Sequence, residues 1–428
     1  MRWLKLLISA AVTAGLFYVL NFGQQIGSVQ LPPLGKFLSP FTGFWQNGTQ
    51  GDETVDTLEF PELRDKVTVV WDDRRVPHIF AQNAYDLYFA QGYITARNRL
   101  WQMEFQTHAA AGRLSEIVGE RALPLDKFRR RIGMVYVAEN SLKMMRSDEV
   151  GIETVLAYTA GVNAHIRELN GSNKPLEYKI LNYTPEEWTP LKCALLLKYM
   201  SWDLTGRNSE RAMTRTREAL GDDFMKTLYP DYPPFQDPIV PSETKWDFTP
   251  KTIQQPSSVF TPSASAQIDL PQPHRWNGSN NWAVSGAKTA SGNAILSSDP
   301  HLLLRLPSVW YEMQLSMPGL NVYGVTLPGS PAVTIGFNNA IAWGMTNAGS
   351  DVLDWYEIKF KDNSYDEYWH DGQWKSTVGR IEKIKVRGGE AVIDTVYYTH
   401  HGPVVDLQNK ATVNSMTVPG AAMRWVAH

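Results

Sequence analysis

The stretch RWNGSNNWAVSG, residues 275–286, places a Gly-Ser bond, Gly278-Ser279, among tryptophans and asparagines. Three interpretations compete. Asn-Gly favours the positive φ angles of a tight hairpin turn. Asn277-Gly278-Ser279 also fits the N-x-S pattern of a glycosylation acceptor. In the third interpretation the Gly278-Ser279 bond is cut, which leaves Ser279 as a new N-terminus. The rest of the chain decides among them.

Composition narrows the classes of function. The 428 residues are 43% hydrophobic and 20% charged, which is enough apolar material for a sizeable core. Lys plus Arg count 41 and Asp plus Glu 44, so we expect no nucleic-acid partner. The single cysteine, Cys193, excludes a disulfide framework and a cysteine-based metal site, and its apolar helical context predicts a core position.

Residues 1–22 are typical of an export signal or a retained membrane anchor. Arg2 and Lys5 precede an apolar segment, 6–20, which is long for a signal core and short for a membrane span. We therefore predict a periplasmic or cell-envelope location, with membrane contact through this segment alone. The alternative is a buried N-terminal helix.

The predicted secondary structure of the remaining chain changes once, from mainly helix to short strands. Residues 23–60 are rich in Gly, Pro, Gln and Asn and are predicted to be a linker. After a hairpin, apolar residues at three- and four-residue spacing predict a mainly helical region within 61–250. Residues 251–278 are rich in Pro, Ser and Gln and predict an exposed spacer. Residues 279–428 read as short strands separated by turns.

Cutting the Gly278-Ser279 bond would give the Ser279 hydroxyl the base that it needs to act as a nucleophile. A serine hydroxyl is a poor nucleophile until a base takes its proton. As the first residue of a chain, Ser279 would use its own α-amino group, whose pKa is roughly 7.7 to 8.0. The same hydroxyl can attack the Gly278 carbonyl, so cleavage can be autocatalytic. Taken alone, however, GSNNW favours the turn.

A resemblance over some 340 residues raises the third interpretation. Three long segments resemble the penicillin acylase family of N-terminal-nucleophile hydrolases: VPHIFAQNAYDLYFAQGYITARNRLWQMEFQTHAAAGRLSEIVG, GSNNWAVSGAKTASGNAILSSDPHLLLRLPSVWYEMQL and PGSPAVTIGFNNAIAWGMTNAGSDVLDWYEI, followed by THHGPVV. The resemblance implies an α+β fold, a partial four-layer αββα sandwich with a helical small subunit. It also implies one precursor cut into two subunits, and hydrolysis of a small-molecule linear amide through an acyl-enzyme.

The resemblance assigns roles to matching positions. Ser279 corresponds to the nucleophile and amine base, and the cut falls between Gly278 and Ser279. His301, in SDPHL, matches a residue whose backbone contacts that amine. Asn347, in WGMTNAG, matches the residue whose backbone N–H forms half of the oxyanion hole. Candidate residues of an apolar acyl pocket, a pattern that a packed core also gives, are Met200, Leu204 and Trp310.

Calcium is the one cofactor that the resemblance implies. SDVLDW places Asp351 and Asp354 three residues apart, with the carbonyl of Leu353 between them. Hard cations prefer such oxygen ligands, although two solvated acids have the same spacing. The family's structural Ca²⁺ site adds a glutamate, which corresponds to Glu210. One ion would then hold the two subunits together after cleavage.

The match ends before the family's pattern does. Family members continue beyond AAMRWVAH, and the asparagine side chain that completes the oxyanion hole, with a nearby arginine, lies in that portion. We therefore expect a missing C-terminal portion, an open sheet edge, and little stability or activity of this chain alone.

Other hydrolase patterns give no better account. Ser285 and Lys288 fit S-x-x-K, but the segment reads as strand, turn and strand, and G-x-S-x-G and H-E-x-x-H are absent. His400 and His401 are interpreted as a bare pair at a strand end, without a third metal ligand. The alternative function is a non-catalytic envelope binding protein that keeps the acylase architecture and an intact Gly278-Ser279 bond.

Overall fold

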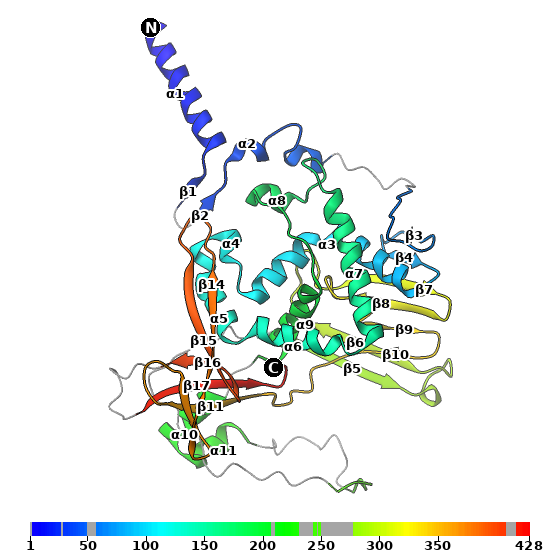
Figure 1. Cartoon of the computed structure of the whole chain (residues 1–428). Coiled ribbons are helices and arrows are strands. Elements are labelled where there is room, and N and C mark those ends of the chain that lie inside the picture. The colour runs from blue at the N-terminus through cyan, green and yellow to red at the C-terminus, as the bar shows by residue number, and fades with distance from the viewer. Residues whose placement is uncertain are drawn as a thin grey trace.

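The computed structural model describes residues 2–26, 29–48, 57–206, 210–230, 243–245, 247–249, 277–407 and 417–428. The predicted spacer therefore lies outside the described residues, except for positions 277 and 278. Within the described residues a group of helices lies between two β-sheets, which confirms the predicted α+β class (Figure 1).

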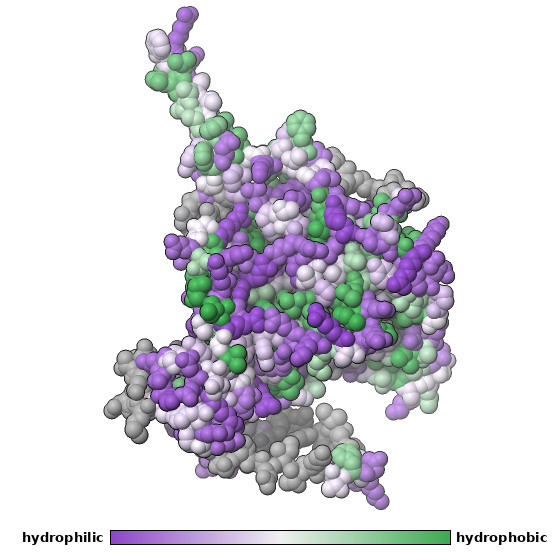
Figure 2. Space-filling model, viewed as in Figure 1, coloured by the Kyte–Doolittle hydropathy of each residue, from purple (hydrophilic) through white to green (hydrophobic). Residues whose placement is uncertain are grey.

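The N-terminal helix α1 (Arg2–Asn21) projects away from the rest of the chain (Figure 1). It is 20 residues long, none of its residues is buried, and it is long and apolar enough to cross a membrane. Its hydrophobic surface is exposed along its length (Figure 2). The alternative of a buried N-terminal helix is therefore wrong, because the described residues leave α1 exposed along its length.

The segment predicted as a linker contains short elements that connect α1 to the body. These are β1 (Gln24–Ile26), β2 (Val29–Leu31), α2 (Leu34–Phe37) and η1 (Phe44–Asn47). Lys179 fixes the end of this segment, because its Nζ donates to the carbonyl of Gly43 at 3.0 Å and to Oδ1 of Asn47 at 2.7 Å.

The longest helix, α3 (Ala84–Ala111), is defined at both ends by local chemistry. The side chain of Asn83 accepts a hydrogen bond from the backbone N–H of Asp86 at the first turn, and Gly112 ends the helix at φ 63°. A methyl group at Gly92 would lie 2.1 Å from the carbonyl oxygen of Tyr158 in α7. Glycine thus permits the close crossing of α3 and α7. The other helices are α4 (Ser115–Val118), η2 (Glu120–Ala122), α5 (Leu123–Arg131), α6 (Met134–Met145), α7 (Glu149–Glu168), α8 (Leu176–Leu181), α9 (Pro190–Thr205), α10 (Glu210–Leu220) and α11 (Asp222–Leu228).

One sheet joins the two halves of the chain. Its strand order is β10-β9-β8-β7-β4-β3, and β4 pairs with β7 in parallel, so the early hairpin extends a sheet built by the later strands. The strands are β3 (Thr68–Trp71), β4 (Pro77–Phe80), β7 (Tyr311–Met317), β8 (Leu320–Thr326), β9 (Ile335–Asn338) and β10 (Ala342–Trp343). A separate ribbon, β5 (Gly278–Val284) and β6 (Ile295–His301), is linked by η3 (Gly286–Lys288).

The second sheet has the order β13-β12-β11-β17-β16-β15-β14. Its strands are β11 (Leu353–Phe360), β12 (Glu367–His370), β13 (Gln373–Ser376), β14 (Val378–Ile384), β15 (Val392–Thr399), β16 (Gly402–Leu407) and β17 (Val418–Trp425). The last strand, β17, is not an edge of this sheet, because it pairs with β11 along its whole length and with β16 from Gly420 to Ala422. The edge strands among the described residues are β13 and β14.

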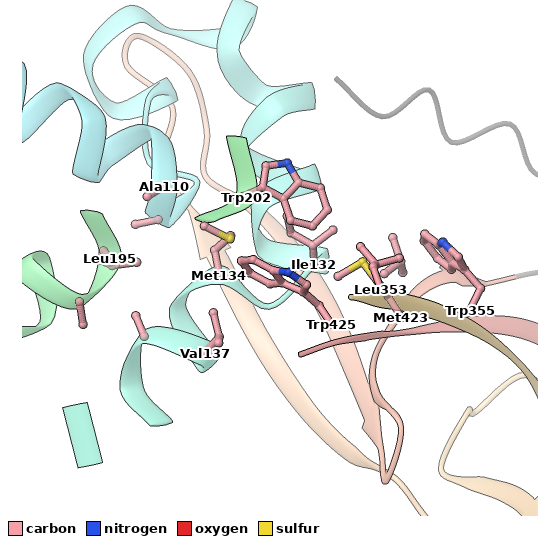
Figure 3. Packing of buried hydrophobic residues seen from close by; sticks show 14 of the residues in the cluster. Ala110, Ile132, Met134, Val137, Leu195, Trp202, Leu353, Trp355, Met423 and Trp425 are labelled. Atoms are coloured by element: carbon pink, nitrogen blue, oxygen red, sulfur yellow. The ribbon is translucent and has the colours of Figure 1, made fainter. Parts of the chain in front are cut away.

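A shared core attaches the helices to this second sheet. Side chains from α6 and α9 point toward side chains from β11 and β17 (Figure 3). At the centre, the rings of Trp202 and Trp425 meet edge to face with centroids 5.4 Å apart, and each is 2% exposed. Cys193 is buried in a neighbouring cluster, as predicted. Burial of this apolar surface holds α9, which also borders the candidate site, in a fixed position.

Candidate functional site

Ser279 is the second residue of β5, and the strand places it beside β6. The register sets Gly278 opposite His301 and Ser279 opposite Pro300. The interpretation of Asn-Gly as a tight turn is wrong, because Gly278 and Ser279 begin an extended strand. Ser279 is half-buried, and its Oγ lies 2.6 Å from Oγ1 of Thr346.

An apolar cavity of about 530 Å³ opens next to Ser279. Most of the predicted site residues line it, together with further residues of α9 and of the 345–348 segment. Predicted residues on the lining are Met200, Leu204, Gly278, Ser279, Trp310 and Asn347. A cavity of this size is in the range of small-molecule sites. The structure thus brings together residues that are up to 147 positions apart in the chain, from Met200 to Asn347.

His301 is close to the Gly278-Ser279 bond but is absent from the cavity lining. A methyl group at Gly278 would lie 3.8 Å from Nδ1 of His301, so the imidazole lies alongside Gly278. Its Nε2 is 2.8 Å from Oδ2 of Asp299, which orients the ring. The side chain is 43% exposed. His301 therefore lies across the strand pair from Gly278, beside the predicted cut.

The segment after β10 closes over Ser279 because Gly344 has no side chain. A β carbon there would lie 2.5 Å from the β carbon of Ser298. Three residues later, Nδ2 of Asn347 donates to the carbonyl of Leu204 at 2.8 Å, and its Oδ1 accepts from the N–H of Gly349 at 2.8 Å. The Asn347 side chain therefore fastens the segment to the end of α9.

The hydroxyl of Ser279 has a hydroxyl as its partner in the described structure, and a threonine hydroxyl is no base at neutral pH. The imidazole of His301 contacts Asp299 and not the Ser279 hydroxyl. The carboxylate of Asp203 lines the cavity. Burial raises the pKa of Asp203, while Arg129 and Arg305 oppose that change. With the 278–279 bond intact, the nitrogen of Ser279 is an amide and cannot take a proton. In the uncut chain, therefore, the Ser279 hydroxyl has no described side-chain base as its hydrogen-bond partner.

Three carboxylates from distant segments meet beside β11. Glu210 begins α10, Asp354 lies on β11 and Asp351 precedes that strand; one carboxylate oxygen of each lies within 4.8 Å of the others. Partial burial raises the pKa of Glu210 to about 7, with further contributions from the charges of Asp351 and Asp354. Leu353, whose carbonyl is the fourth predicted ligand, is 4% exposed at the start of β11. Three acids at this spacing fit a hard divalent cation.

The sequence model of the penicillin amidase family matches residues 66–428. The chain belongs to this family.

Several family members are similar to most of the chain. An acyl-homoserine lactone acylase, QuiP of Pseudomonas aeruginosa, is 31% identical over 339 residues, which cover 77% of this chain and 39% of that protein. The penicillin acylase 2 proenzyme of a Pseudomonas species is 28% identical over 361 residues, or 82% of this chain and 45% of that protein. The chain thus spans less than half the length of these relatives. A solved thermostable penicillin G acylase from Alcaligenes faecalis is 31% identical over 28% of this chain and 20% of its own, with a TM-score of 0.25.

Sequence comparison with the penicillin acylase pattern missed two residues that the structure places at the site. Thr346 contacts the Ser279 hydroxyl, and Gly344 permits the approach of its segment. Both stand within WGMTN, next to the predicted Asn347, so their neighbourhood in sequence was the available signal. Their contact with β5 and β6 depends on the tertiary arrangement alone.

Proposed function

We propose that the chain is an acylase that hydrolyses a linear amide of a small molecule through Ser279, once the Gly278-Ser279 bond has been cut. The observation that carries this proposal is the position of Ser279: its hydroxyl lies at an apolar cavity, 2.6 Å from a hydroxyl and without a side-chain base as hydrogen-bond partner among the described residues. Membership of the penicillin amidase family and the names of the acylase relatives support the same reaction.

The proposed reaction begins with the free α-amino group of Ser279. The amine takes the Oγ proton while Oγ forms a bond to the substrate carbonyl carbon, and the π electrons of the carbonyl move to its oxygen. The backbone N–H of Asn347 donates to that oxyanion, a contribution of about 3 kcal/mol in comparable sites. The intermediate collapses as the ammonium returns its proton to the leaving amine. Water then attacks the ester by the same route and regenerates Ser279.

Other residues position the reacting groups in this proposal. Thr346 fixes the Ser279 hydroxyl, and His301 supports the strand end at the α-amine. Met200, Leu204 and Trp310 surround the acyl group, so the substrate class is an amide with an apolar aliphatic or aromatic acyl portion.

Calcium has a structural role in this proposal. Glu210, Asp351, Asp354 and the carbonyl of Leu353 would hold one ion, whose two positive charges would offset most of the negative charge of the three acids. Because Glu210 precedes the cut and the other ligands follow it, the ion would join the two subunits made from one precursor.

We also propose that α1 holds the protein at the cell envelope, with the body in the periplasm. Arg2 and Lys5 at the start of α1 favour a cytoplasmic N-terminus by the positive-inside rule. Phe41 and Trp45, 80% and 56% exposed, follow α1 and belong to the residue types that are enriched at membrane interfaces.

Mass spectrometry of the mature protein tests the first step. We expect two chains, the second beginning at Ser279, and a single uncut chain for Ser279→Ala. Ser172→Ala is a matched control, because Asn170-Gly171-Ser172 repeats the Asn-Gly-Ser context, yet the N–H of Ser172 donates to Oδ1 of Asn170 at 2.8 Å in an exposed turn. Ser172→Ala should be cut as the wild type is. An uncut wild-type chain without hydrolysis would favour the envelope binding protein, and an uncut chain that hydrolyses amides would contradict the scheme.

The second step is tested on the cut protein. Incubation with a chromogenic amide that carries an apolar acyl group should add the mass of that acyl group to the chain beginning at Ser279. Leu204→Phe, which fills part of the cavity, should slow acylation by a long acyl group about tenfold or more and that by an acetyl group much less. Equal slowing for both amides would remove Leu204 from the acyl pocket.

A further inference from the structure

Three histidines from two separate turns meet at one end of the seven-stranded sheet. His370 is the last residue of β12, and His400 and His401 form the turn between β15 and β16. One ring nitrogen of each lies within 4.8 Å of the others. The interpretation of His400 and His401 as a bare pair is therefore wrong. Although three strands separate β12 from β15 in the sheet, Tyr368 Oη on β12 reaches Nδ1 of His400 at 3.0 Å.

The surroundings leave one nitrogen of each ring available. Nε2 of His370 lies 3.1 Å from a carboxylate oxygen of Asp371, so a proton on Nε2 leaves the Nδ1 lone pair free. Tyr368 Oη accepts from the backbone N–H of His400 at 3.3 Å and lies 3.0 Å from Nδ1 of the same residue. In the tautomer of His400 that carries its proton on Nδ1, the lone pair of Nε2 is available to a metal ion. Metal-binding histidines are commonly oriented by such second hydrogen bonds.

His401 completes the group from a fixed position. Its ring stacks on Tyr356 with centroids 3.8 Å apart and an interplanar angle of 13°. Its Nδ1 is buried without a hydrogen-bond partner in the described structure. A buried nitrogen of this kind is costly unless something binds it.

We propose that His370, His400 and His401 form a binding site for a divalent transition-metal ion of the zinc class. Imidazole nitrogens suit Zn²⁺, Co²⁺, Ni²⁺ and Cu²⁺, whereas the carboxylates of Glu210, Asp351 and Asp354 suit Ca²⁺. The two sites therefore select different ions. The ion joins the β12–β13 turn to the β15–β16 turn and stabilises the curvature of the sheet between them.

The geometry needs a small adjustment to receive the ion. Zn–N bonds of about 2.0 Å in a tetrahedral site set the nitrogens about 3.3 Å apart. The present separation of up to 4.8 Å closes by rotation of His400, which is exposed and borders an open cavity of about 780 Å³. The same cavity gives the ion a path from solvent. Water can occupy the fourth position on that side.

Nearby charges provide a specific test. The positive charges of Lys375 and Arg424 act on His400 and so also repel a cation there, while the negative charge of Asp371 partly offsets them. Lys375→Gln should therefore tighten metal binding at low ionic strength, when screening is weak. A role of the histidines in ring stacking alone gives no such effect.

Titration of the full chain with Zn²⁺ and Co²⁺, in excess Ca²⁺ to saturate the carboxylate site, tests the proposal. We expect one tightly bound Zn²⁺ per chain by calorimetry and the visible absorption of four-coordinate Co²⁺. His370→Ala and His400→Ala should each weaken binding at least tenfold, and Lys375→Gln should strengthen it. His78→Gln, a histidine on β4, is the control and should bind as the wild type does. Circular dichroism checks that each variant is folded. Absence of a stoichiometric site, or unchanged affinity in folded His370→Ala and His400→Ala, would overturn the proposal.

Discussion

Replacing Glu210 with glutamine should have opposite effects on stability with and without calcium. In the absence of divalent ions the Glu210 carboxylate lies near the carboxylates of Asp351 and Asp354, and its pKa is raised from 4.5 to about 7. A carboxyl group whose pKa is raised on folding stabilises the folded state at a pH below its unfolded pKa. That stability is lost as the pH rises from about 4.5 through about 7.

The magnitude follows from the pKa. Each pKa unit corresponds to about 1.36 kcal/mol, so the rise of the Glu210 pKa from 4.5 to about 7 corresponds to a loss of about 3 kcal/mol of folding stability at high pH. Glu210 is only half-buried, and solvent screening reduces this to about 1 to 2 kcal/mol. Glu210→Gln should therefore be about 1 to 2 kcal/mol more stable than the wild type at pH 8 in a chelator. With Ca²⁺ at about 100 times its dissociation constant, the wild type should gain about 2.7 kcal/mol and become the more stable protein.

Urea denaturation followed by circular dichroism, between pH 4 and 8, with chelator or with Ca²⁺, measures these differences. Glu218→Gln is the matched control, because Glu218 lies on the same helix and is exposed. It should keep both the pH dependence and the response to Ca²⁺. If Glu210→Gln also keeps both, the three carboxylates do not form a coupled cation site, and the reasoning fails.

Three further substitutions test how the site is held. Gly344→Ala places a β carbon 2.5 Å from that of Ser298, so the segment must move, and mass spectrometry should find cleavage at residue 279 slowed about tenfold or more. Thr346→Val removes the hydroxyl that contacts Ser279 and should slow the same cleavage by a similar factor, whereas Thr346→Ser keeps a hydroxyl and should slow it much less. Equal cleavage rates in the two variants would show that the hydroxyl contact does not position Ser279. Trp202→Ala removes a side chain that meets Trp425 in the core and should cost about 3 to 5 kcal/mol of unfolding free energy, as measured in urea; a cost under 1 kcal/mol would contradict the described packing.

Local patterns in the sequence predicted the elements well where one physical rule dominates. Apolar residues at three- and four-residue spacing predicted the helical region, and α3 is its longest helix. The charged start and apolar run of residues 1–22 indicated an export signal or an anchor, and α1 is long and apolar enough to cross a membrane. The change to short strands after Ser279 likewise follows from alternation and turns. These features depend on interactions within a few residues.

Partners across the sheets could not be predicted in this way. The position of β17 between β11 and β16, and the approach of His370 to His400, depend on strand order and on the curvature of the sheet. Sequence spacing carries no information on either. For the same reason the unpaired appearance of His400 and His401 was misleading.

The sequence by itself determined the family, because several ordered motifs over some 340 residues resemble it. The α+β class and the candidate nucleophile Ser279 followed from that resemblance, since the Gly-Ser bond taken alone favours a turn. Only the tertiary structure decided that Met200, Trp310 and Asn347 share one cavity with Ser279, and that Thr346 contacts its hydroxyl. The physical reason is the distance along the chain over which each kind of interaction acts. Backbone preferences act between near neighbours in the chain, whereas a site is made by burial of apolar surface, which brings together any segments whose side chains fill the same space.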